Sequence, residues 1–119
     1  MSGVTNITNL LEAGLRAEGL REKATASNVA NLGTPGYRAL DVRFEELLSK
    51  ALASGEGADI EDLEGEVFAA EATPVKANGN DVSLEAEVGK MVKNTLRHTA
   101  YVRLLSKKYR QIELAMNVK

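Results

Sequence analysis

Apolar residues recur at alternating spacings of three and four through the last third of the chain. The resulting row runs without a slip for more than four heptads, and we call it the heptad row: Leu84, Val88, Met91, Thr95, His98, Val102, Leu105, Tyr109, Ile112 and Met116. This pattern is typical of a helix in a coiled coil. It predicts one helix over residues 83–118, roughly 50 Å long at about 1.5 Å per residue. Asn80, Asp81 and Ser83 are its candidate N-caps.

A shorter stripe near the amino terminus has the same spacing and predicts a helix over residues 1–32. Its members are Leu10, Ala13, Ala17, Leu20 and Ala24. The alanines would let another helix approach closely, so we expect this stripe to pack against the heptad row. The predicted fold is mainly α, with long amino- and carboxyl-terminal helices paired as a coiled-coil-like hairpin.

Further apolar residues of the last helix lie off the heptad row. They are Val92, Leu96, Leu104, Leu114 and Val118. A helix that is apolar on more than one flank cannot be covered by one shorter partner helix. The remaining apolar surface therefore predicts contact with other subunits.

The segment between the two long helices is predicted to begin with a turn and a short helix over residues 33–53. Phe44, Leu47, Leu48 and Leu52 stand at helical spacing. This spacing favours a helix over residues 42–53, with Asp41 as its cap. The whole chain, residues 1–119, has the length of a single domain.

Residues 54–82 are predicted to be an irregular, acidic segment. It contains two candidate short strands, at residues 67–70 and 73–77, and Pro74 would restrict the second to a sheet edge. Asn78 and Gly79 form a strong turn signal. A calcium loop does not fit, because aligning Gly65 with the required glycine puts Ile60 at the first ligand position.

Charge is segregated along the chain although the net charge is only −2. Residues 1–50 are neutral, residues 51–89 carry −9 and residues 90–119 carry +7. The middle and the end of the chain should therefore attract each other, within one molecule or between neighbours. No long basic tract indicates nucleic-acid binding, and no apolar run reaches the length of a membrane span. The first residues lack the features of a cleaved signal peptide.

The residues needed for catalysis or metal binding are scarce. The chain has no cysteine and one histidine, so it has no thiolate metal site. No phosphate-binding or nucleophile motif is present. We therefore expect neither an enzyme nor a bound cofactor or metal ion. His98 lies on the heptad row, where a neutral packed residue is the more common role. A pH switch at that position is the alternative.

The stretch from Ala24 to Tyr37 begins as helix and ends as a tight turn. Its notable positions are Ser27, Asn28, Ala30, Asn31, Thr34, Pro35, Gly36 and Tyr37. Asn31 and Gly33 tolerate a left-handed helix stop. Pro35 and Gly36 suit the second and third positions of a turn that needs a positive φ at the third. The two asparagine amides could bond to freed carbonyls or to a second helix. By itself, the stretch is also compatible with an ordinary helix cap and loop.

Taken with the heptad row, this stretch resembles the amino-terminal motif of the flagellar axial proteins, which build the rod, hook and hook–filament junction. The motif letters are ASNVANLGTPGY, followed by RALDVRF and later by NGNDV before the last helix. The resemblance covers about residues 10–50 and 78–116, and within the family it is strongest to proximal rod subunits. Gly33 departs from the family, which often has a polar residue there.

The resemblance implies a structural subunit of the proximal rod on the periplasmic side of the inner membrane. It implies export without a cleaved signal peptide through the flagellar type III apparatus, then polymerisation through the terminal helices into a hollow drive shaft. The implied partners are copies of the chain, the rod proteins FlgC, FlgF and FlgG, the adaptor FliE and the MS ring protein FliF. The alternatives are another rod subunit such as FlgC, or a cytoplasmic helical-hairpin adaptor or chaperone.

Overall fold

The computed structural model describes residues 2–54 and 60–117, and side chains from residue 6 onward. Part of the predicted acidic segment, residues 55–59, and the end of the predicted last helix, Val118, lie outside the described residues. The molecule is elongated, with extents of 67 × 28 × 15 Å. No helix of the described part is both long and apolar enough to cross a membrane.

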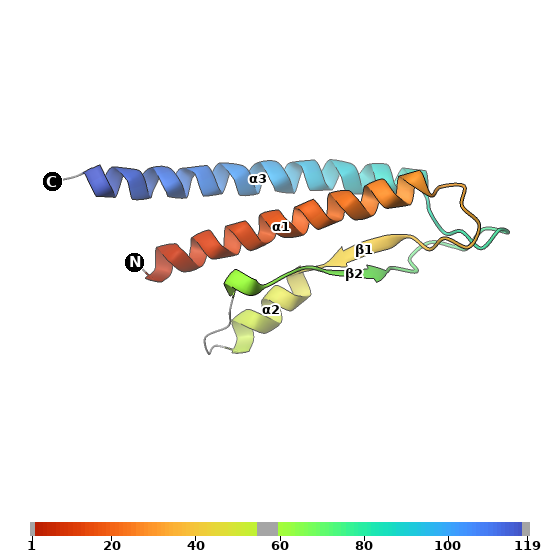
Figure 1. Ribbon diagram of the computed structural model, residues 1–119, viewed down its shortest axis with the longest axis horizontal. Helices are drawn as coiled ribbons and strands as arrows, with labels where there is room; N and C mark the ends of the chain where they lie inside the picture. The colour runs from red at the N-terminus through yellow and green to blue at the C-terminus, as the bar shows by residue number, and fades with distance from the viewer. Residues whose placement is uncertain (1, 55–59, 118–119) are drawn as a thin grey trace.

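Two long antiparallel helices run along the long axis of the molecule (Figure 1). Helix α1 spans Ser2–Ala30 and helix α3 spans Leu84–Asn117. They pack along each other, which confirms the predicted pairing of terminal helices. Ser83 is the N-cap of α3, because its hydroxyl accepts a hydrogen bond from the Ala86 amide at 3.3 Å.

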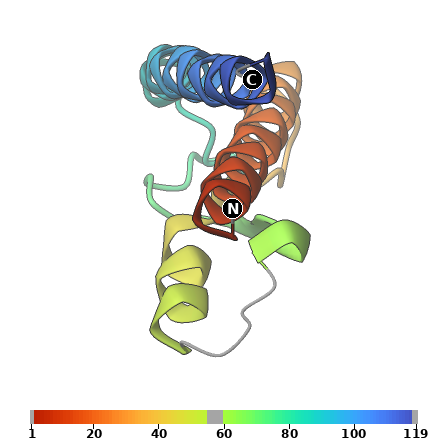
Figure 2. The same ribbon diagram turned by 90° about the vertical axis from the view of Figure 1, so that its left-hand side faces the viewer.

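The middle of the chain lies on the other side of α1 from α3 (Figures 1 and 2). It contains the strand β1 (Leu40–Arg43), the helix α2 (Glu45–Ser54), the short 3₁₀ helix η1 (Ile60–Asp62) and the strand β2 (Glu66–Ala69). The two strands pair antiparallel, with Leu40 opposite Ala69 and Arg43 opposite Glu66. Helix α1 is therefore the central element, covered by α3 on one side and by this layer on the other.

The hydrophobic core lies between α1 and the middle layer. Ala13 and Ala17 of α1 pack with Phe44, and all three are 1% exposed. Leu48 of α2 and Leu63 pack against this group. Small residues on α1 let the Phe44 ring approach the helix closely, so one aromatic side chain fills most of a thin core.

The predicted helix over residues 42–53 begins later than the sequence indicated. Residues 40–43 form β1, and α2 begins at Glu45, where the Phe44 carbonyl accepts the first helical hydrogen bond from Leu48 at 2.8 Å. Asp41 is not a cap, because it lies in β1 opposite Phe68. Pairing with β2 explains the change, since the strand buries Val42 to 5% exposure.

The other local predictions have mixed outcomes. The strand predicted at residues 67–70 is confirmed as β2, whereas residues 73–77 form no strand.

Gly36 has the expected positive φ of 76°, and Gly79 has a φ of 84° in the predicted turn. The left-handed stop at Asn31 or Gly33 is wrong, because neither has a positive φ. Helix α1 instead ends in short turns, with Thr34 donating to the Asn31 carbonyl at 3.1 Å.

Candidate functional site

The face that α3 presents to α1 is polar. Glu87 and Asn94 are 1% and 3% exposed, and Arg97 and Tyr101 follow at the same helical spacing. Gly14 of α1 provides room for the Tyr101 ring, because a Cβ at this glycine would lie 2.4 Å from two of the ring atoms. From Glu87 to Tyr101, the contact between the two helices is thus made one residue before members of the heptad row.

An ion cluster around the buried Glu18 joins the two helices near their middle. One carboxylate oxygen of Glu18, which is fully buried, accepts from Arg21 at 2.6 Å and from Arg97 of α3 at 2.7 Å. Arg21 also binds Glu45 at 2.5 Å, so the cluster reaches α2. Burial opposes the charge of Glu45, but the hydrogen bond from Arg21 holds the pKa of this carboxyl below its ordinary value. Breaking such a buried pair is costly, which fixes α3 on α1 in one rotation and register.

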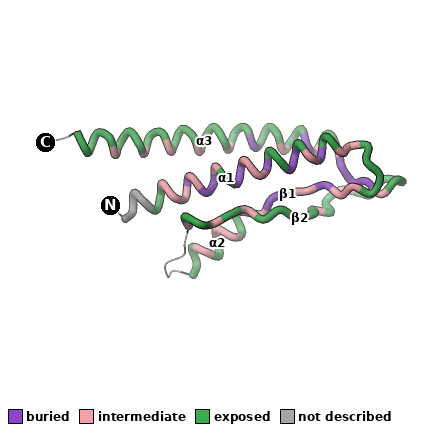
Figure 3. Tube along the Cα trace, in the orientation of Figure 1, coloured by how far each residue is buried: buried purple, intermediate pink, exposed green. Residues whose placement is uncertain are grey.

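The heptad row is correspondingly left at the surface of the monomer, and Figure 3 shows most of α3 as exposed. Six of its residues are between 39% and 79% exposed, namely Leu84, Val88, Met91, Val102, Tyr109 and Met116. Thr95 and His98 are exposed, and Leu105 and Ile112 are half-buried. The premise that His98 is packed is wrong, so a switch based on burying it has no support in the monomer.

The predicted pairing of the α1 stripe with the heptad row does not occur within one molecule. Ala13, Ala17 and Ala24 are buried and Leu10 and Leu20 are half-buried. However, the core partner of Ala13 and Ala17 is Phe44 rather than α3. The reason is electrostatic, because Glu18 and Arg21 need charged or polar partners that an apolar row cannot supply.

A half-open groove runs between the second half of α1 and the start of α3. Its volume is about 540 Å³, and it is lined mainly by small and apolar side chains, with Glu22, Thr25, Ala26, Val29 and Ala30 facing Met91, Asn94 and Thr95. The apolar surface continues across α3 to Val88, Val92 and Leu96, which line a second shallow hollow. Val92 and Leu96 are 57% and 67% exposed. This continuous apolar surface is uncovered in the monomer, and it suits a packed helix.

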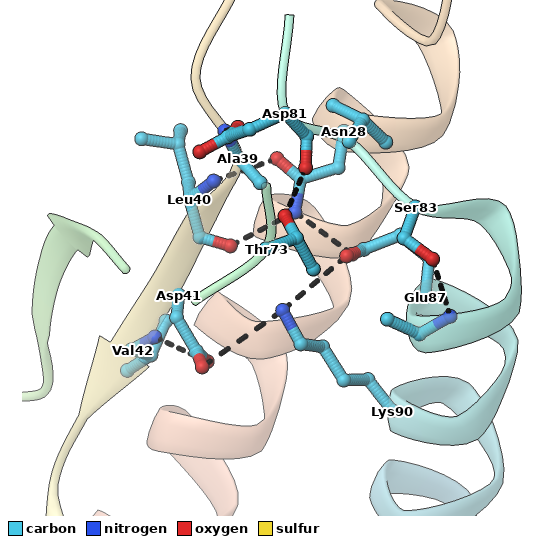
Figure 4. A network of polar contacts seen from close by, with 12 residues as sticks. Asn28, Ala39, Leu40, Asp41, Val42, Thr73, Asp81, Ser83, Glu87 and Lys90 are labelled. Carbon is cyan, nitrogen blue, oxygen red and sulfur yellow. Dashed lines mark hydrogen bonds and ion pairs between the residues drawn. The ribbon is translucent and has the colours of Figure 1, made fainter. Parts of the chain in front are cut away.

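Asn28 ties together the end of α1, β1 and α3 (Figure 4). Its amide nitrogen donates to the Leu40 carbonyl and to the Glu87 carboxylate, each at 2.8 Å. Its amide oxygen accepts from the Leu40 amide at 2.8 Å and from the Tyr37 hydroxyl at 3.0 Å. An asparagine side chain can make four such bonds, and this fully buried one makes all four. Of the two alternatives considered for the asparagine amides, Asn28 thus adopts the bond to a second helix.

The other motif residues shape the turn that follows α1. The Asn31 side chain donates to the Ser27 carbonyl at 2.8 Å, beside the Asn31 backbone amide at 3.0 Å, and accepts from the Thr34 hydroxyl at 3.0 Å. The Ser27 and Tyr37 hydroxyls lie 2.8 Å apart. Pro35 and Gly36 form the turn itself, closed by the Tyr37 amide donating to the Thr34 carbonyl at 3.3 Å. Ala30 differs from these residues in lining the groove.

Residues just before α3 complete the same polar network. Fully buried Asn80 donates to the Asn31 and Thr34 carbonyls, each at 2.8 Å. Asp81 accepts from the Ala39 amide at 2.5 Å and from Arg38 at 2.9 Å. The Ala39 amide and the Arg38 guanidinium hold the pKa of Asp81 below its ordinary value, outweighing the effect of burial. These bonds hold the segment just before α3 against the turn that follows α1.

The sequence indicates Asn80 and Asp81 as candidate caps and as part of the NGNDV letters, but it does not indicate that Glu18, Arg97 and Glu87 are bonded between elements. Buried charges are hard to find from a pattern, because their partners are remote in sequence. Arg97 is 79 residues from Glu18, and Glu87 is 59 residues from Asn28. In the described ranges, no three histidine or acidic side chains are grouped so that they could hold a metal ion. The arrangement serves to hold helices and to present an apolar face.

Comparisons with known proteins identify homologues of the chain, although no family model matches it. The protein named flagellar basal body rod protein FlgB from Bacillus subtilis (strain 168) is 27% identical over 119 residues, covering 92% of each chain. A protein of the same name from Cereibacter sphaeroides is 27% identical over 111 residues, covering 82% of this chain and 87% of that protein. The chain is thus a homologue of curated proteins named flagellar basal body rod protein FlgB.

Proposed function

We propose that the chain is a structural subunit of the flagellar basal body rod, and specifically of its proximal part. The observation that carries the proposal is the exposed heptad row of α3. Apolar surface of this extent on a long helix is costly in water and is typical of an interface. The homology to proteins named flagellar basal body rod protein indicates that the assembly with this interface would be the rod.

In this proposal the polar cluster and the apolar row have separate roles. Glu18, Arg21 and Arg97 fix the hairpin within a monomer, and the heptad row with Val92 and Leu96 packs against neighbouring copies. Helices of adjacent copies would enter the groove beside Ala26 and Val29. Repeated head-to-tail contacts of this kind generate a helical filament, and a ring of such filaments would enclose the hollow drive shaft used for motility and export.

The partners follow from the same proposal. They are copies of the chain, the rod proteins FlgC, FlgF and FlgG, the adaptor FliE and the MS ring protein FliF. The chain would reach the periplasmic side of the inner membrane through the flagellar type III export apparatus, without cleavage of a signal peptide.

The substitution Leu96→Asp tests this function. Leu96 is 67% exposed, so the aspartate should leave the folded monomer intact and block the contact with a neighbour. We expect the purified variant to keep the helical circular dichroism of the parent chain. In a strain that carries only this variant, isolated basal bodies should lack the chain and cells should not swim.

Ser49→Asp is the matched control, because Ser49 is an exposed position of α2 away from α3 and the substitution adds the same charge. This variant should be incorporated and support swimming. Normal motility with Leu96→Asp would refute the proposal.

A further inference from the structure

The carboxyl-terminal half of α3 carries a basic stripe, which we define as Arg103, Lys107 and Arg110. All three are exposed, and with Val102 and Ser106 they line a shallow groove of about 310 Å³. None of them forms an ion pair with any described residue. At about 100° per residue they lie roughly 180–240° around the helix from Tyr101, which packs at Gly14. The stripe therefore points away from α1.

An acidic edge occupies the opposite side of the molecule. We define it as Glu61, Asp62 and Glu64, at and just after η1, and all three are exposed. Arg16 of α1 lies beside them but donates to the backbone oxygens of Glu61 at 2.8 Å and of Leu63 at 3.4 Å. The carboxylates of the edge form no ion pair with described residues, so their charge is available to a partner.

Helix α1 separates the two charged surfaces. Both ribbon views place α3 on one side of α1 and η1 on the other (Figures 1 and 2). The stripe and the edge of one molecule thus face in different directions and do not neutralise each other. Two complementary surfaces on opposite sides of one subunit make a heterologous contact, which continues from copy to copy rather than closing into a dimer.

We propose that the basic stripe of α3 docks onto the acidic edge of a second copy of this chain. Three observations favour this occupant. The two surfaces have opposite charge, neither has an ion-pair partner among the described residues, and they lie on opposite sides of α1. The proposal deepens the proposed function and rests on it, because it assigns one of the contacts between copies in the assembly. Charge pairs at such a contact would set orientation and speed association more than they raise affinity.

Disulfide trapping tests the contact, and it is clean because the chain has no cysteine of its own. Two full-length chains are purified, one with Lys107→Cys and a size tag, the other with Asp62→Cys. They are mixed under mild oxidation, and the tagged heterodimer is measured over time. A disulfide between different chains reports only an intermolecular contact. Lys107→Cys mixed with Val75→Cys is the control, because Val75 is 51% exposed and follows β2, outside the residues that define the acidic edge.

We expect the test pair to form heterodimer about tenfold faster than the control pair at roughly 0.01 M salt, where the Debye length is about 30 Å. The difference should fall below about twofold at 1 M salt, where the Debye length is about 3 Å. Adding Arg103→Glu and Arg110→Glu to the first chain should slow the test pair to the control rate. Adding Glu61→Lys and Glu64→Lys to the second chain as well should restore the faster rate.

Equal rates for test and control pairs at low salt, or a difference that salt leaves unchanged, would overturn the proposal. So would binding of the stripe to vesicles of anionic lipid without any fast heterodimer, since the stripe would then belong to a membrane contact. These outcomes are independent of the Leu96→Asp experiment. If the charged contact fails while Leu96→Asp still blocks incorporation, the proposed function stands without this contact.

Discussion

Asn28 offers the sharpest test of how the motif region is held together. Its side chain makes four hydrogen bonds, and both the asparagine and its partner Glu87 are buried. A typical hydrogen bond contributes about 1 kcal/mol net, and each buried group left without a partner costs about 1–3 kcal/mol. We therefore expect Asn28→Ala to lower the free energy of unfolding by about 3–5 kcal/mol. That is a large part of the roughly 5–15 kcal/mol of a small domain.

The measurement is urea unfolding of the purified chain followed by circular dichroism. Asn6→Ala is the control on the same helix, because Asn6 is exposed and its replacement should not destabilise the chain. Asn28→Asp adds a second test of the same geometry. The new carboxylate would face Glu87 and the Leu40 carbonyl, where the asparagine now donates at 2.8 Å.

Two facing carboxylates raise the pKa of at least one of them, so the aspartate variant should regain stability relative to the parent chain as the pH falls from about 7 to 5. A loss below about 0.5 kcal/mol in the alanine variant would show that the four bonds do not stabilise the fold as described, because about 0.5 kcal/mol is the lower limit for even one net hydrogen bond. An aspartate variant whose relative stability does not change with pH would refute the assigned donor direction.

Two further predictions concern the same region. Gly36→Val should lower the free energy of unfolding by about 1–2 kcal/mol, because Gly36 has a φ of 76° and a left-handed backbone is strained for a β-branched residue. Urea unfolding measures this loss. Gly33→Ala is the control and should be neutral, because Gly33 has no positive φ and a Cβ there meets nothing within 4 Å. Asp81, whose pKa is lowered in the fold, should stabilise the chain fully above its unfolded pKa of about 3.9 and lose this contribution as the pH falls below that value. The urea midpoint of Asp81→Asn should therefore lie below that of the parent chain at pH 6 and approach it at about pH 2–3; a constant difference would contradict the assigned shift.

The sequence predicted the elements whose determinants are local. The two long helices follow from apolar periodicity, the cap from Ser83, and the turn from Pro35 and Gly36. The strand β1 could not be predicted in this way, because its partner β2 is remote in sequence and Leu40 pairs with Ala69. Its residues instead looked like the start of the following helix.

The rotation of α3 about its axis was the main error, and its cause is physical. A heptad pattern identifies an apolar row but does not say whether a helix of the same chain or of another chain covers it. The intramolecular contact is decided by buried polar groups, above all Glu18 with Arg97 and Asn28 with Glu87. These pairs turn the apolar row outward, where most of its residues are exposed in the monomer.

We propose that the heptad side of α3 is open in the free subunit and covered in the assembly. The most direct measurement is the rate at which a maleimide labels Val92→Cys, the only cysteine of the variant chain, in the purified monomer and in isolated basal bodies. Val92 is 57% exposed in the monomer, so labelling there should be fast. If neighbouring subunits cover this side of α3, the reaction in basal bodies should be at least about tenfold slower, equivalent to about 1.4 kcal/mol of protection. Equal labelling rates in the two forms would contradict it.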